Sequence, residues 1–146
     1  MFVHADFMHL LFNMIALIIF GSYLERLIGP WRMVASFFMC GFMANVLALV
    51  YASSSGQIAS YVAVGASGAI LGLLGNCGVI MYKVWKVYRS LVAKRFFTQV
   101  VVILCLQLTV DLIVVQSSMI HHVIGAVTGA LIGHYMVRFR SNIRPL

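Results

Sequence analysis

The sequence predicts an all-α, polytopic membrane bundle with five transmembrane helices, and three properties of the chain lead to this fold class. Hydrophobic residues make up 63% of its 146 residues and only 9% are charged, whereas soluble proteins carry about 25% charged residues. The mean hydropathy is +1.05. The apolar residues also gather into runs of about 20, the length that crosses a bilayer as a helix. Together these properties exclude an ordinary soluble domain.

Five such runs follow one another in a single membrane domain over residues 1–146. A polar break, Ser53–Gln57, separates the second from the third. Because the runs are apolar all round, helical periodicity does not show which face of each helix points inward. The expected spans are 7–24, 33–51, 67–84, 97–115 and 120–137.

Positive charge falls on one side of these spans. Ten Lys and Arg stand against three Asp and Glu, a net charge of +7, and the loops after spans two and four carry none of the ten. By the positive-inside rule the basic side is cytoplasmic, together with the C-terminus. We therefore expect a multi-pass protein of the cell membrane, surrounded by lipid bilayer. Nucleic-acid binding is not expected, because too little polar surface remains for a basic groove.

Two further expectations concern the ends and loops of the spans. The basic segment Lys83–Arg95 is expected to be a long loop lying on anionic lipid headgroups. Five spans with a cytoplasmic C-terminus put the N-terminus outside, although His4 and Asp6 begin the chain with no helix before them. We therefore expect either a preceding helix that this sequence does not contain or a chain that starts outside.

Cysteines and histidines do not form a recognisable metal pattern. Cys40, Cys77 and Cys105 each lie within an apolar run, which is typical of core packing and not of a disulfide framework. No Cys or carboxylate at a recognised spacing completes a zinc site with the histidines. We expect no metal and no cofactor.

The segment Gly65-Ala66-Ser67-Gly68 begins the third span at its outer end. A serine flanked by small residues at a helix N-terminus has an accessible hydroxyl beside free backbone N–H donors. These are a nucleophile and the start of an oxyanion hole. The alternative is a small-residue contact between helices, because the pattern alone is weak.

Polar residues of two other spans lie at the same depth. His9 and Asn13 are four residues apart in the first span, hence on one helical face, and His122 lies near the start of the fifth. The alternatives are a hydrogen-bonded pair holding the bundle together and an interfacial histidine. Since spans one, three and five all enter from outside, a nucleophile, a base and two donors share one layer.

Glycines predict that the third and fifth spans approach closely. Gly125, Gly129 and Gly133 recur every four residues, and Gly68, Gly72 and Gly75 line the third span. Small residues let membrane helices pack closely. His122 shares the face of Gly125, and we expect it to meet Ser67.

These segments, in this order, resemble the signature motifs of the rhomboid intramembrane serine proteases. Residues 4–13 are similar to H-x4-H-x3-N, residues 65–68 to G-x-S-G and residues 122–129 to H-x2-G-x3-G, and residues 21–29 match G-x3-E-x3-G. The resemblance implies a rhomboid-like bundle that cleaves transmembrane protein substrates near the outer surface.

The same resemblance implies roles for individual residues. Ser67 would be the nucleophile and His122 its general base, while His9, Asn13 and the Ser67 backbone N–H would form the oxyanion hole. Gly65, Gly68, Gly125 and Gly129 would be structural. Span four would be the lateral gate for substrate.

Two departures from the family pattern leave alternatives open. The family's first helix and the loop after it are not in this sequence, and Leu71 stands where some members have an aromatic residue. The alternative function is a catalytically inactive, rhomboid-like or truncated protein that binds transmembrane partners.

Asp111, near the outer end of span four, has two interpretations. It could be a third member of a triad that orients the imidazole, or it could hydrogen-bond neighbouring helices or be held neutral. Because the resemblance implies a Ser–His dyad, the second is the expectation.

Overall fold

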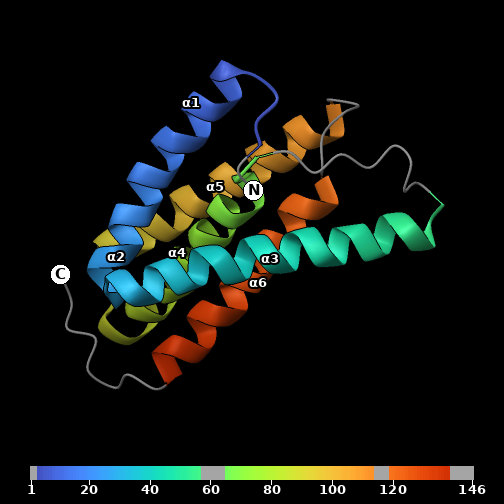
Figure 1. Cartoon of the computed structure of the whole chain (residues 1–146). Coiled ribbons are helices and arrows are strands. Elements are labelled where there is room, and N and C mark those ends of the chain that lie inside the picture. Colours follow the sequence, from blue (N-terminus) through green and yellow to red (C-terminus); the bar gives the residue numbers. More distant parts are fainter. Residues whose placement is uncertain (1–2, 57–64, 114–118, 139–146) are drawn as a thin grey trace.

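The computed structural model describes residues 3–56, 65–113 and 119–138, and over these ranges the chain is a bundle of helices without a β-strand (Figure 1). The all-α fold class is thereby confirmed. The first helical rod comprises α1 (Phe7–Ala16), a π-helical turn (Leu17–Gly21) and α2 (Ser22–Ile28). The others are α3 (Pro30–Ser54), α4 (Ser67–Tyr88), α5 (Leu91–Ile113) and α6 (Met119–Arg138).

Gly29 makes the sharp junction between α2 and α3. Its N–H donates to the Glu25 carbonyl at 2.7 Å, and its backbone lies at φ 90° and ψ 160°, a region that essentially only glycine adopts. Pro30 then begins α3 at the first helical position, where its missing N–H costs nothing. The chain therefore reverses between two long helices without a loop.

Helix α4 occupies the centre of the bundle, and its neighbours are arranged around it (Figure 1). In its most apolar stretch of 18 residues, 78% of the residues are buried, whereas the corresponding share of α5 is 11%. Helix α4 contacts α6 most extensively, followed by α3 and α5. The exposed surface of α5 is rich in aliphatic residues such as Leu106, Leu112 and Ile113, as expected for a helix that faces lipid.

The predicted close approach of spans three and five is confirmed at atomic detail. A Cβ added to Gly125 would collide with the carbonyl oxygen of Gly68, and one added to Gly129 would collide with that of Gly72. Conversely, a Cβ added to Gly75 of α4 would collide with the Ala126 carbonyl oxygen of α6. Helices α4 and α6 are therefore packed backbone against backbone, and we call this seam the glycine seam.

Four described helical segments are long and apolar enough to cross a membrane: 7–28, 30–54, 67–88 and 91–113. The protein is therefore a multi-pass membrane protein. Helix α6 is 20 residues long and is not among these four. The helix expected at 120–137 is present, and its crossing of the membrane stays a prediction.

The helices extend beyond the expected spans. The expectation of a long loop over Lys83–Arg95 is wrong: α4 continues to Tyr88, α5 begins at Leu91, and Arg89 makes the turn with φ 55°. Lys and Arg are good helix formers, and their long side chains reach the headgroups from a helix that continues past the hydrocarbon. The basic residues therefore do not mark where α4 ends or where α5 begins.

The basic residues gather at the end of the bundle opposite Ser67. Leu24 and Ile28 at the end of α2 share one core cluster with Met81 and Val84 of α4 and with Ala93 of α5. In addition, Lys83 Nζ donates to the His134 carbonyl of α6 at 2.7 Å. The ends of α2, α4 and α6 and the start of α5 therefore lie together. Arg140 and Arg144 lie outside the described residues.

Candidate active site

Ser67 is the first residue of α4, directly after the bend at Gly65 and Ala66. Gly65 has φ +92°, and Ala66 caps the helix without a side-chain hydrogen bond. Because the first N–H groups of a helix have no acceptor within it, donors and a positive dipole end surround the Ser67 hydroxyl. The side chain is half-buried, so it is not sealed within the bundle.

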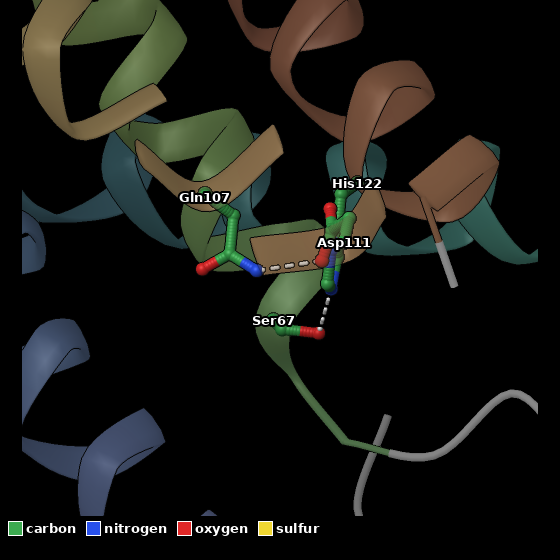
Figure 2. Close-up of polar contacts among 4 residues, drawn as sticks. All are labelled: Ser67, Gln107, Asp111 and His122. Carbon is green, nitrogen blue, oxygen red and sulfur yellow. Dashed lines mark hydrogen bonds and ion pairs between the residues drawn. The ribbon is translucent and has the colours of Figure 1, made fainter. Parts of the chain in front are cut away.

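His122 of α6 reaches Ser67 across the glycine seam. Its Nε2 lies 2.8 Å from Ser67 Oγ (Figure 2), within the reach that proton transfer requires. Gly68 and Gly125, one residue after the serine and three after the histidine, are in direct backbone contact. The glycine seam therefore holds these two side chains together, although they are 55 residues apart in sequence.

The other ring nitrogen of His122 contacts Asp111 of α5. His122 Nδ1 and Asp111 Oδ2 are 2.7 Å apart, with 12% of the His122 side chain and 1% of the Asp111 side chain exposed. Gln107, one turn earlier on α5, donates its Nε2 to Asp111 Oδ1 at 2.8 Å (Figure 2). Asp111 therefore hydrogen-bonds a neighbouring helix, as expected, and its partner there is the His122 imidazole. The triad interpretation of Asp111 would use the same contact.

The expected oxyanion donors lie on α1, beside the start of α4. A Cβ on Gly65 would come within 2.8 Å of His9 Nε2. The His9 ring therefore lies against Gly65, the residue two positions before Ser67. Asn13 is buried, with 6% exposed, and its amide Nδ2 donates to the His9 carbonyl at 2.7 Å. The structure thus brings His9 to the serine segment and engages the Asn13 amide within its own helix.

His121 was not singled out from the sequence, although it precedes His122. Its ring covers Gly68, where an added Cβ would collide with it, and the residue is 2% exposed. Its Nε2 has no hydrogen-bond partner within the described part of the chain. Burial of the His121 ring follows from the absence of a side chain at Gly68, a relation visible only once α4 and α6 are paired.

A groove of about 320 Å³ lies elsewhere, between Phe20 and residues 96–103 of α5. Ile103 is eight residues before Asp111, or about 12 Å along a helix. The groove is therefore separate from the serine and histidine. Among the described residues, no group of three His, Cys, Asp or Glu is arranged to hold a metal ion.

A helical membrane bundle in which a serine hydroxyl meets a carboxylate-bonded imidazole at one end has the geometry that serine hydrolases use. In a comparison with known families, residues 1–139 match the Rhomboid domain. The chain belongs to the rhomboid family.

Individual relatives are similar over most or part of the chain. The Bacillus subtilis protein named "Putative rhomboid protease YdcA" is 29% identical over 93% of this chain and 64% of its own length. The Arabidopsis thaliana RHOMBOID-like protein 6, mitochondrial, is 36% identical over 62% of this chain and 27% of its own. Inactive RHOMBOID-like protein 8 of the same plant is 30% identical over 60% of the chain and 23% of its own. The chain thus spans less than two thirds of each relative, and no solved structure matches it significantly.

Proposed function

We propose that this protein is an intramembrane serine protease that cleaves transmembrane protein substrates, with Ser67 as nucleophile and His122 as general base. The observation that carries the proposal is the 2.8 Å contact between Ser67 Oγ and His122 Nε2. A serine beside an imidazole is activated for attack on a carbonyl. Membership of the rhomboid family supports the same activity.

The reaction would proceed in two stages. Ser67 Oγ attacks the scissile carbonyl carbon while His122 Nε2 takes the hydroxyl proton, and the same proton then passes to the departing amine as the peptide C–N bond breaks. Water, deprotonated by His122, hydrolyses the acyl-enzyme ester and regenerates the serine. The developing oxyanion would be stabilised by the Ser67 backbone N–H, His9 and Asn13, where loss of one donor typically costs about 10²–10³ in rate.

For Asn13 this role requires its amide to leave the His9 carbonyl, to which it donates at 2.7 Å. His9 does not need to move in this way, because its ring already adjoins Gly65. We therefore assign His9 as the nearer donor and Asn13 as a donor recruited when substrate binds.

The site would face the non-cytoplasmic side. The basic end of the bundle, opposite Ser67, is expected to be cytoplasmic by the positive-inside rule. A substrate helix would enter laterally past α5, the helix with the smallest buried share among the membrane-spanning candidates.

The test uses the protein expressed from its complete natural gene and reconstituted in vesicles with a single-span protein substrate. A fluorophosphonate should label the wild type, and both labelling and cleavage should vanish in Ser67→Ala and His122→Ala. Two matched controls remove the same side chains elsewhere: Ser54→Ala at the end of α3, and His134→Ala on the exposed surface of α6. Equal labelling of wild type and Ser67→Ala would refute the proposal.

The alternative is an inactive rhomboid-like protein that binds transmembrane partners. The name of one relative, Inactive RHOMBOID-like protein 8, favours considering it. It predicts that a transmembrane partner is retained uncleaved, with equal affinity by wild type and Ser67→Ala.

A further inference from the structure

We propose that Asp111 is a positioning residue of the active site, so that this rhomboid works with a Ser67–His122–Asp111 triad in place of a dyad. The proposal rests on the proposed function of Ser67 and His122. Its basis is the 2.7 Å contact between Asp111 Oδ2 and His122 Nδ1, at the ring nitrogen that does not contact the serine.

With Asp111 as a carboxylate, the contact determines which nitrogen of His122 carries the proton. A carboxylate only accepts hydrogen bonds, so Nδ1–H is the donor to Asp111. Nε2 then presents its lone pair to the Ser67 hydroxyl, which is the tautomer that a general base requires. When Nε2 takes the serine proton, the resulting imidazolium is paired with the carboxylate.

The surroundings of Asp111 hold its carboxylate in this role. The Asp111 side chain is 1% exposed, and a buried carboxylate is costly unless each oxygen is hydrogen-bonded. Oδ2 has the His122 ring and Oδ1 has the Gln107 amide at 2.8 Å. The two partners divide the oxygens between them, so the carboxylate cannot rotate away from His122 without losing one of these bonds.

The placement of Asp111 on α5 is the second line of support. The buried residues of α5 are Ala93, Val100 and Asp111. They are separated by 7 and 11 residues, which both return to the same face of a helix with 3.6 residues per turn. Asp111 is therefore the outermost of three residues that face the bundle, and its charge is directed at the active site and not at lipid.

The competing explanation is that Asp111 makes a purely structural hydrogen bond between α5 and α6. The Asp111→Asn variant distinguishes this explanation from the triad. Asp111→Asn keeps the shape and can still bond both neighbours. With its oxygen accepting from Gln107, however, its amide N–H₂ faces His122 Nδ1 and stabilises the tautomer with the proton on Nε2. That tautomer cannot accept the serine proton.

The experiment measures cleavage of a transmembrane substrate by the reconstituted protein, expressed from its complete gene, and compares Asp111→Asn, Asp111→Glu and wild type. We expect kcat of Asp111→Asn to fall by about 10²–10⁴ with KM within about twofold. Asp111→Glu should be more active than Asp111→Asn, because it restores the carboxylate despite its extra methylene. A structural role predicts the opposite order, since asparagine fits the space better.

Two controls complete the experiment. Thr109→Val, on the exposed surface of α5, should leave kcat unchanged, and thermal unfolding of Asp111→Asn should match that of the wild type. Asp111→Asn activity within threefold of wild type, or above that of Asp111→Glu, overturns the triad while Ser67-dependent cleavage by the wild type upholds the proposed function. Absence of Ser67-dependent cleavage in the wild type overturns both.

Discussion

At the scale of single residues, the candidate active site depends on side chains that are absent as much as on those that are present. Gly68 adjoins Ser67, the proposed nucleophile, and its missing side chain leaves room for the buried His121 ring. His121 is in turn the neighbour of the proposed base. The position of His122 is therefore sensitive to any group added at Gly68.

Gly68→Ala tests this sensitivity. The new methyl group would occupy the space of the His121 ring, and because that ring is 2% exposed it cannot yield without moving the start of α6. We expect the rate of Ser67 acylation by a fluorophosphonate to fall about 10²-fold, the effect of a displacement of about 1 Å at a catalytic group. Gly78→Ala is the matched control on the same helix, where the added Cβ meets chiefly a methyl group of Val100. Equal rates for the two variants would contradict the packing argument.

At the scale of helices, the seam between α4 and α6 determines how closely two membrane helices approach. At Gly125 and Gly129 the neighbour that a Cβ would strike is backbone and not the end of a flexible side chain. Since backbone cannot yield locally, the whole helix must move.

Gly129→Ala should therefore destabilise the protein by about 1–3 kcal/mol, the usual cost of overpacking. The free energy of unfolding can be measured in mixed micelles by titration with a denaturing detergent. Val127→Ala, on the exposed surface of the same helix, should change it by less than about 0.5 kcal/mol. A smaller loss for Gly129→Ala than for Val127→Ala would show that the helices are not in contact at this point.

The helices themselves and the meeting of Ser67 with His122 could be predicted from the sequence, because run length, depth and small-residue spacing are all encoded locally. Helix ends could not, as the continuation of α4 to Tyr88 shows, because basic residues are compatible with both a helix end and a loop. The partner of Asp111 could not be assigned either. Its depth follows from its place in span four, but an all-round apolar helix gives no signal of which way that side chain points.

At the scale of the whole molecule, the basic residues and the candidate catalytic residues lie at opposite ends of the bundle. Ser67, His122 and Asp111 meet at one end, and the turn at Arg89 between α4 and α5 lies at the other. Around this turn Lys86 and Lys94 lie over the ring of Trp85, the kind of aromatic and basic cluster that is common at membrane interfaces.

Cysteine accessibility tests the proposed orientation. Ser54→Cys at the end of α3 should react with a membrane-impermeant maleimide added to intact cells, and Ser90→Cys in the turn after α4 should react only after the membrane is opened. A background control covers the natural cysteines: Cys40 and Cys77 are buried, and Cys105 is exposed within α5, a candidate membrane span. The reverse labelling pattern would mean that the proposed site faces the cytoplasm.

The uneven burial of the helices has a mechanical consequence. Ser67 and His122 lie on the two helices with the most extensive mutual contact, whereas Asp111 lies on α5, of which little is buried. Thinning or stretching of the surrounding lipid shifts loosely held helices first. We therefore expect such deformation to change the distance between the Asp111 carboxylate and the His122 imidazole more than the distance between the Ser67 hydroxyl and the imidazole.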